Sequence, residues 1–329
     1  SGARQQKLMK AITYSRYGSP EVLTLSEVPT PQPEEDQLLI RVRAVEATKS
    51  DCEMRSFRYP VKWFSLPLRI AMGITKPRRP ILGFYFSGEV AAVGTGVTGF
   101  TVGDEVFGTS RFRLGAYAQY LAVPEHFPLA AKPSDMSFIE AAAVPLGGFN
   151  ALHFMDRARI EPGASVLIIG AGGSIGTHAV QIAKARGATV TVVDRGSKET
   201  ALRGFGADHF IDYERETFTR SDAQYDVIFD MVPDTDYRAC QNRLKPGGRY
   251  LSGNPRVATM LRIFLTNRLG VTTASFAFAP ETKQALEELK KMIEAGQIRS
   301  IVDLTFSMNQ AAQAHRQVET EQRVGAVVI

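Results

Sequence analysis

Residues 165–176 read SVLIIGAGGSIG, a continuous apolar run followed at once by a turn rich in glycine. The apolar part predicts a buried strand at 166–169, and the pattern of 175–186 predicts a helix directly after the turn. Glycines let the backbone approach a pyrophosphate, whose charge is met by free N–H groups and by the helix N-terminus. The turn therefore predicts a dinucleotide site, with the candidate residues Gly170, Gly172, Gly173, Ser174, Ile175 and Gly176.

The chain on both sides of this turn alternates apolar runs with helical patterns, starting after Pro145. Strands are expected at 166–169, 189–193, 209–211, 227–229, 249–252 and 271–276. Because helical patterns separate them, these runs predict an α/β fold with a parallel, doubly wound sheet of Rossmann type.

The first part of the chain has a different sequence pattern, in which short strand-like runs are divided by glycine and proline. In residues 40–44 the polarity alternates with period two, as in a strand with one wet face. The last segment predicts helices at 281–294 and 309–319 and strands at 301–306 and 326–329, and we expect it to return to the first module. The expected domains are a catalytic domain over 9–130 and 276–329, and a nucleotide-binding domain over 131–275.

Composition narrows the class of protein. The 329 residues suffice for two domains, and 44% hydrophobic with 22% charged residues is typical of a globular chain. The two cysteines, Cys52 and Cys240, can build neither a disulfide framework nor a four-cysteine zinc site, so we expect a reducing, cytoplasmic setting. The net charge of +5 is mild, and the apolar stretches are too short to span a membrane.

The strand after the turn ends in residues that give opposite signals about the cofactor. The carboxylate of Asp194 would accept hydrogen bonds from a free ribose 2′-hydroxyl, which favours NAD(H), and would repel a 2′-phosphate. Arg195 and Lys198 could instead pair with that phosphate. A third interpretation is that these are solvated charges at a strand end.

Ordered sequence blocks extend along nearly the whole chain from Met9. They are 9–11 (MKA), 18–23 (GSPEVL), 88–90 (GEV), 102–108 (VGDEVFG), 115–118 (GAYA), 141–146 (AAAVPL), 206–213 (GADHFIDY) and 244–249 (LKPGGR). With the glycine turn, these blocks resemble the zinc-free, quinone-oxidoreductase-like branch of the medium-chain dehydrogenase/reductase superfamily. The resemblance implies a GroES-like β-barrel catalytic domain into which a Rossmann nucleotide-binding domain is inserted.

The resemblance also bears on metal chemistry. Zinc-dependent relatives use a Cys and a G-H-E motif, where this chain places Thr48 and residues 83–85 (GFY). No metal is therefore expected, and the five histidines are interpreted as surface or packing residues. Without a metal to stabilise an alkoxide, reduction of a conjugated carbonyl is easier than oxidation of an alcohol, which favours quinones, enones and 2-alkenals.

Four residues depart from the usual pattern of the branch, namely Thr48, Tyr85, Asn150 and Ala326. Tyr85 is a candidate proton donor to a developing enolate, or else an aromatic wedge in the barrel. Thr48 with Asp51 could orient the substrate, or only close a turn. Asn150 stands where the family has a threonine facing the nicotinamide.

By resemblance, Tyr213 falls where a tyrosine often lies against the 2′-phosphate of NADPH, and Val232, Gly253 and Asn254 are expected to line the cofactor cleft. These residues favour NADP(H), with NAD(H) as the alternative. Arg195, Lys198 and Tyr213 would surround the 2′-phosphate while Asp194 turns away.

Two stretches, 54–88 and 237–280, contain no acidic residue and seven basic residues each. Apolar residues of 57–70 and an apolar helical face at 256–269 could form a lid over a bulky substrate, a dimer surface, or a patch for an anionic membrane or nucleic acid. The lid is favoured, with Trp63 as its test residue. We expect a homodimeric NADPH-dependent reductase acting on small hydrophobic acceptors. The alternative is a cofactor-binding regulatory or RNA-binding protein without turnover.

Overall fold

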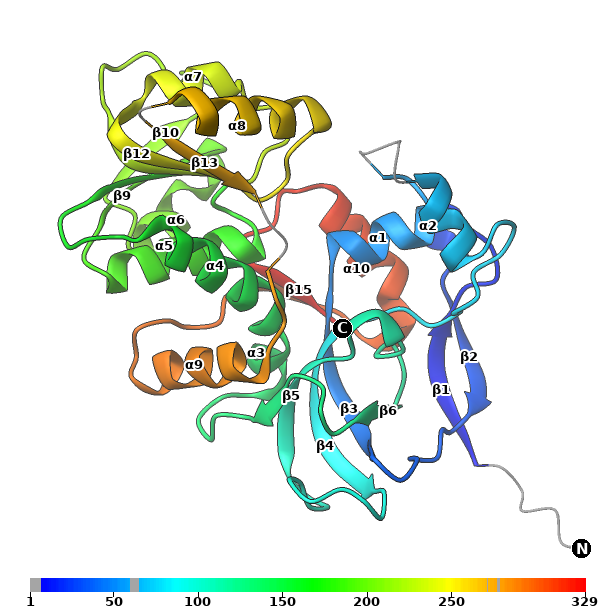
Figure 1. Cartoon of the computed structure of the whole chain (residues 1–329). Coiled ribbons are helices and arrows are strands. Elements are labelled where there is room, and N and C mark those ends of the chain that lie inside the picture. The colour runs from blue at the N-terminus through cyan, green and yellow to red at the C-terminus, as the bar shows by residue number, and fades with distance from the viewer. Residues whose placement is uncertain (1–6, 60–64, 271, 277–278) are drawn as a thin grey trace, which may run out of the picture. The chain divides into compact units, whose positions relative to one another are not determined.

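The computed structural model describes residues 7–59, 65–270, 272–276 and 279–329. The chain divides into two compact units (Figure 1). Unit 1 comprises residues 1–145, 281–290 and 302–329, and unit 2 comprises residues 146–280 and 291–301. Trp63, the test residue of the expected lid, lies outside the described residues.

Unit 2 is built on a six-stranded sheet with the order β10-β9-β8-β11-β12-β13. The strands are β8 (Ser165–Ile169), β9 (Thr189–Asp194), β10 (His209–Asp212), β11 (Tyr225–Asp230), β12 (Leu244–Ser252) and β13 (Thr273–Phe276). Every neighbouring pair is parallel, which confirms the doubly wound sheet expected from the alternating pattern.

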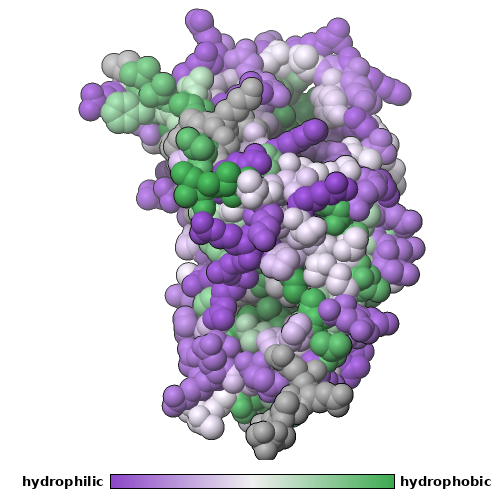
Figure 2. Space-filling model, turned by 90° about the vertical axis from the view of Figure 1, so that its right-hand side faces the viewer, coloured by the Kyte–Doolittle hydropathy of each residue, from purple (hydrophilic) through white to green (hydrophobic). Residues whose placement is uncertain are grey.

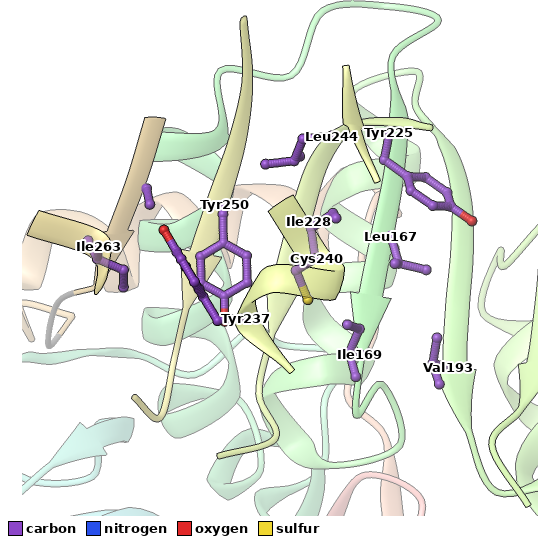
Figure 3. Close-up of a cluster of buried hydrophobic side chains, with 11 residues drawn as sticks. Leu167, Ile169, Val193, Tyr225, Ile228, Tyr237, Cys240, Leu244, Tyr250 and Ile263 are labelled. Atoms are coloured by element: carbon purple, nitrogen blue, oxygen red, sulfur yellow. The ribbon is translucent and has the colours of Figure 1, made fainter. Parts of the chain in front are cut away.

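The helices of unit 2 cover both faces of this sheet. They are α4 (Pro145–Ala158), α5 (Ser174–Ala185), α6 (Glu199–Gly204), α7 (Tyr237–Asn242) and α8 (Val257–Leu269). Figure 1 shows α7 and α8 on one side of the sheet and α4, α5 and α6 on the other. Between sheet and helices lies a cluster that includes Leu167, Ile228 and Tyr250, with the ring of Tyr237 edge-on to Tyr250 at 5.1 Å (Figure 3). Burial of these side chains fixes which face of each strand points inward.

The outer face of α8 is unusual because its large apolar residues point to solvent. Ile263 is buried against the sheet, whereas Leu261 and Phe264 are 63% and 56% exposed. Arg268 lies over the Phe264 ring at 4.7 Å. The helical spacing expected for 256–269 is confirmed, but what covers its apolar face stays a prediction. Figure 2 shows how hydrophobic residues gather in patches on one face of the molecule.

Unit 1 holds two sheets. A two-stranded sheet joins β1 (Leu8–Thr13) and β2 (Thr24–Pro29), and a seven-stranded sheet has the path β14-β15-β3-β4-β5-β7, with β6 paired to β3. Its strands are β3 (Gln37–Ala47), β4 (Tyr85–Val93), β5 (Glu105–Thr109), β6 (Tyr120–Pro124), β7 (Leu129–Ala131), β14 (Val302–Thr305) and β15 (Ala326–Val328). The helices are α1 (Lys49–Ser56), α2 (Ser65–Met72), α3 (Phe138–Ala142), α10 (Ala311–Glu319) and α9 (Lys283–Glu294), of which residues 291–294 belong to unit 2. Because β15 pairs antiparallel with β3, the end of the chain returns to the module that its beginning builds.

The unit boundaries lie later than those expected from the sequence. Ala142 in α3 packs with Ala44 and Val328, so the segment before residue 146 belongs to unit 1. In the opposite direction, Gln181 of α5 donates to the carbonyl of Arg299 and accepts from its N–H. These two bonds tie residues 291–301 to unit 2.

No helix in the described part of the chain is both long and apolar enough to cross a membrane.

Candidate functional site

The glycines of the turn have different reasons to lack a side chain. Gly170 has φ +81°, a left-handed conformation that glycine adopts without strain. A Cβ at Gly176 would lie 2.4 Å from the carbonyl oxygen of Ala171, so this glycine lets α5 approach the turn closely. A Cβ at Gly173 would meet no atom within 4 Å, which leaves the turn open on that side.

The N-terminus of α5 opens on this space. Gly173 is the N-cap and supplies no side-chain cap, so the first N–H groups of the helix keep their donor capacity. The hydroxyl of Ser174 is buried and has no hydrogen-bond partner in the described part of the structure. An open glycine, uncapped N–H groups and an unpartnered hydroxyl together fit a pyrophosphate. Ile175, the next candidate, is half-buried in the first turn of α5.

Asp194 is engaged with the turn itself. One carboxylate oxygen, Oδ2, accepts from the N–H of Gly172 at 2.7 Å, and Oδ1 accepts from the N–H of Arg195 at 2.7 Å. The ammonium of Lys198 lies 3.3 Å from Oδ1, and both side chains are only 8% exposed. Asp194 thus turns toward the glycine turn, and Lys198 lies against it.

Arg195 contacts Tyr213 and Glu214 instead of the glycine turn. Its Nε lies 3.2 Å from Oε1 of Glu214, and its guanidinium makes a hydrogen bond with the side chain of Tyr213. This bond, with the negative charge of Glu214, raises the pKa of Arg195 further above its ordinary value. Because Tyr213 is 51% exposed, this group of residues can be reached by a ligand. Glu214 is a residue that sequence reasoning missed.

The carboxyl ends of adjacent strands β8, β11 and β12 bring further candidates together. A Cβ at Gly170 would lie 3.0 Å from a methyl group of Val232, and the N–H of Gly253 donates to the carbonyl of Asp230 at 2.9 Å. Ligands of open parallel sheets bind at such ends, where the strand order reverses. Asn254 follows Gly253 and is half-buried.

Asp230 is a second residue that the sequence analysis missed. Its Oδ1 accepts from the N–H of Val232 and the hydroxyl of Thr235, both at 2.9 Å, and its Oδ2 accepts from the hydroxyl of Tyr250 at 2.8 Å. Burial raises the pKa of Asp230 to about 6, although these hydrogen bonds lower it. This carboxyl fixes the loop that carries Val232.

Asn150 is half-buried in α4, and its side-chain amide donates to the carbonyl of Leu146 at 2.9 Å. The donor of this side chain is therefore directed to its own helix, while its carbonyl oxygen keeps acceptor capacity.

In unit 1, Thr48 and Asp51 form a capping box at the start of α1. Asp51 accepts from the N–H of Thr48 at 3.0 Å and from its hydroxyl at 2.7 Å, and its other oxygen accepts from the N–H of Gly83 at 3.0 Å. Asp51 is fully buried. Burial raises its pKa to about 6, and the hydrogen bonds from Thr48 and Gly83 oppose this rise. The pair closes a turn and ties it to Gly83, two residues before β4 begins at Tyr85.

Behind this pair lies a buried polar chain. The hydroxyl of Tyr117 and Nε2 of His315 are 2.9 Å apart, and Nδ1 of His315 is 3.0 Å from Arg55. Arg55 in turn forms an ion pair with Glu319. Burial, with the charge of Arg55, lowers the pKa of His315 to about 3, so this histidine is neutral. It packs inside unit 1, as interpreted from the sequence.

Tyr85 starts strand β4, and its hydroxyl donates to Oε1 of Glu281 at 2.6 Å. Oε2 of Glu281 accepts from the hydroxyl of Thr109, and the guanidinium of Arg111 donates to the Glu281 carbonyl at 2.7 Å. Burial and the negative charge of Glu281 raise the pKa of Tyr85 well above its ordinary value. Burial also raises the pKa of Glu281. Glu281 was not among the candidate residues, and no short motif marks it.

The described residues contain no group of side chains suited to a metal ion. No cluster of three or more His, Cys, Asp or Glu side chains there could hold a metal ion. Ala326, the fourth departure from the family pattern, is buried in β15 and carries no polar group.

Comparisons with known proteins agree with this architecture. The family model of the alcohol dehydrogenase GroES-like domain matches residues 34–134, and that of a zinc-binding dehydrogenase matches residues 205–329. A GroES-like unit combined with a parallel dinucleotide-binding sheet defines a pyridine-nucleotide-dependent oxidoreductase of the medium-chain type. This chain belongs to the quinone-oxidoreductase-like branch of the medium-chain dehydrogenase/reductase superfamily.

Relatives of this branch match nearly the whole chain. The 2-methylene-furan-3-one reductase of Solanum lycopersicum is 31% identical, and the match covers 98% of this chain and 79% of the relative. The NADPH-dependent alkenal/one oxidoreductase of Arabidopsis thaliana is 31% identical, with 98% and 80% covered. Quinone oxidoreductase of Pseudomonas aeruginosa is 30% identical, with 98% and 99% covered. The structure of quinone oxidoreductase from Coxiella burnetii superposes with a TM-score of 0.86 at 28% identity, covering 98% of this chain and 99% of that one.

Proposed function

We propose that this protein is a zinc-independent reductase that transfers hydride from NADPH to quinones or to α,β-unsaturated carbonyl compounds. The observation that carries the proposal is the open glycine turn at Gly173 and Ser174, in a chain that matches named reductases over nearly its full length. A cofactor-binding protein without turnover is not favoured, because the relatives are named for reductase activity.

The residues of unit 2 have the role of holding and orienting the dinucleotide. The N–H groups at the start of α5 and the hydroxyl of Ser174 would bind the pyrophosphate. Arg195 and Tyr213 would meet the adenosine 2′-phosphate, because both are accessible and both carry donors. When bound, the nicotinamide supplies a hydride. Asp230 would hold the loop of Val232 beside the cofactor.

The proposed role of Tyr85 in unit 1 is to donate a proton. When hydride adds to the β-carbon of an enone, the electron pair of the double bond moves toward the carbonyl oxygen, and the resulting enolate takes up a proton. The raised pKa of Tyr85 keeps its phenol protonated and also makes it a weaker acid, so the proton would be given up only to a strongly basic enolate. In the free protein the single phenol proton is donated to Glu281, so the hydroxyl would have to turn from Glu281 to the enolate to give up that proton, and water would then reprotonate the phenolate. Thr48 and Asp51 would support the site as positioning residues, because both are buried in the capping box.

The substrate class follows from the chemistry that these residues offer. An acceptor in which the incoming charge spreads onto a carbonyl oxygen needs only hydrogen-bond donors to stabilise it. Small hydrophobic quinones and alkenals meet this condition. Cytoplasmic location and a homodimeric state belong to the same proposal, and light scattering of the purified protein tests the second.

The experiment is a steady-state assay that follows NADPH oxidation with an ortho-quinone and with a medium-chain 2-alkenal. We expect turnover with both acceptors, and unchanged rates after dialysis against a chelator. Loss of activity on metal removal that zinc restores would overturn the zinc-independent mechanism. Failure of every acceptor in a quinone and enone panel, with tight NADPH binding, would favour a binding function instead.

A further inference from the structure

We propose that Lys198 controls coenzyme selection by masking the charge of Asp194, and that it is not itself a ligand of the 2′-phosphate. The inference rests on the proposed preference for NADPH and explains how a chain with an acid at the end of β9 can have that preference. It assigns Asp194 and Lys198 to one positioning device.

The Asp194 carboxylate is engaged by backbone N–H groups of the protein. Its two oxygens accept from the backbone N–H groups of Gly172 and Arg195, both at 2.7 Å. An acid that selects NAD(H) must offer its oxygens to the ribose hydroxyls. Here the same oxygens hold the glycine turn to the end of β9, so the acid that resembles an NAD(H) signature performs a structural task.

Lys198 lies where a side chain at position 172 would stand. A Cβ at Gly172 would lie 2.6 Å from Cδ and 2.8 Å from Nζ of Lys198, and 2.9 Å from Oδ2 of Asp194. The space that a side chain at position 172 would need is therefore occupied by the aliphatic stem and the ammonium of Lys198. This gives Gly172 a purpose other than close approach of the cofactor, and it holds Lys198 over the turn, where the residue is only 6% exposed.

The pairing of Lys198 with Asp194 changes the charge that a bound 2′-phosphate would meet. A 2′-phosphate bound near Arg195 would feel an unmasked carboxylate on the neighbouring residue as a repulsive charge, and the repulsion is strong where water is excluded. The ammonium of Lys198, 3.3 Å from Oδ1, cancels this charge. Arg195 is an accessible cation for the phosphate, with the side chain of Tyr213 beside it.

Masking of Asp194 by Lys198 and direct binding of the phosphate by Lys198 predict different NADPH affinities for the double variant. We would compare Lys198→Met, Asp194→Asn and the double variant by titrating the full-length protein with NADPH and with NADH, following binding by fluorescence. If Lys198 masks Asp194, Lys198→Met weakens NADPH binding about tenfold, and NADH binding much less, because the unmasked charge acts on the phosphate. Adding Asp194→Asn then restores the ratio of NADPH to NADH affinity to near that of the parent, since the one turn bond that Asn cannot accept is lost for both cofactors.

If Lys198 binds the phosphate directly, the double variant binds NADPH as weakly as Lys198→Met, and the proposal is overturned. Asp194→Asn alone gives a second reading that does not depend on the folding of Lys198→Met. Under the proposal it leaves the ratio of NADPH to NADH affinity equal or shifted toward NADPH, because the lost turn bond affects both cofactors alike. A selective loss of NADH affinity would show that Asp194 reads the ribose.

Lys184→Met is the control for loss of a paired lysine away from the turn, because Lys184, in the last turn of α5, pairs with Asp208 at 2.9 Å and is more exposed than Lys198. It is expected to change thermal stability without changing the ratio of the two affinities. The parent protein separates this inference from the proposed function. Tighter binding of NADH by the parent contradicts the cofactor preference itself, whereas a parent that prefers NADPH combined with a failed rescue contradicts only the masking role.

Discussion

The hydroxyl of Tyr85 and the carboxylate of Glu281 form a 2.6 Å hydrogen bond, although the two residues are 196 positions apart in the chain. Tyr85 lies at the start of β4, and Glu281 is the residue with which the chain re-enters unit 1. The bond sets the direction of the phenol.

Replacement of Tyr85 by Phe is expected to lower kcat for an enone about a hundredfold, which is typical for loss of a general acid. An ortho-quinone should lose much less, because the anion of an aromatic hydroquinone is stable without immediate protonation. Steady-state assays with both acceptors measure the difference. Tyr14→Phe is the control, since the hydroxyl of Tyr14 is buried in unit 1 without a hydrogen-bond partner among the described residues. Equal losses with both acceptors would argue for an aromatic wedge.

Glu281→Gln tests the partner of Tyr85. The amide oxygen of Gln can still accept the hydrogen bond from the phenol. Because the substitution removes the negative charge of Glu281, the pKa of Tyr85 should fall toward its ordinary value. We expect a modest loss of kcat together with a downward shift of the high-pH limb of the pH–rate profile. An unchanged profile would mean that Tyr85 does not supply the proton.

Arg195 and Glu214 should act on NADPH in opposite directions. Arg195→Ala is expected to raise the Kd of NADPH about tenfold, as for loss of a hydrogen bond to a charged group, and to change that of NADH little. Glu214→Gln should tighten NADPH binding, because it removes the carboxylate that occupies Arg195 in the free protein. Calorimetric titration gives both constants. Arg203→Ala, which removes an exposed pair with Glu199 in α6, serves as the control.

Asp230 should give the protein a measurable pH dependence of stability. Its pKa is about 6 in the folded protein against an ordinary value of 3.8, so the folded state binds more protons between these values. The contribution of this group to the free energy of unfolding is therefore present below pH 4 and falls by up to about 3 kcal/mol as the pH rises to 6. Asp230→Asn should remove this fall in urea titrations at the two pH values. Asp226→Asn, at a site where the pKa is lowered, should change the profile in the opposite sense.

The capping box distinguishes a positioning role of Thr48 from contact with the substrate. Thr48→Ala should lower the free energy of unfolding by about 1–2 kcal/mol, the range for loss of an N-cap, and leave KM for every acceptor unchanged. Ser137→Ala, at the exposed capping box of α3, is the matched control and should cost less. A selective rise in KM for one acceptor class would place Thr48 against the substrate.

The sequence predicted the sheet of unit 2 well because its signals are local. A buried strand such as 166–169 is a continuous apolar run, and the turn after it is rich in glycine. The capping box was also written locally, as Thr48 followed three residues later by Asp51, and this spacing could have indicated a helix start.

Other features of the site depend on contacts that no spacing reveals. The sequence left open whether Asp194 reads the ribose, and its oxygens are engaged by Gly172 and Lys198, whose approach depends on the folded turn. Glu281 looks like an ordinary surface acid in the sequence and becomes significant only because the returning chain lies beside β4 and β5.

The interrupted course of unit 1 has an evolutionary consequence. The residues argued to choose between NADPH and NADH all lie within residues 146–280, whereas Tyr85, Asp51 and Glu281 lie in the segments on either side. The preference for NADPH or NADH and the chemistry at the acceptor are thus encoded in separate stretches of the gene. Selection can adapt the enzyme to a different supply of reducing equivalents while Tyr85 and Glu281 stay as they are.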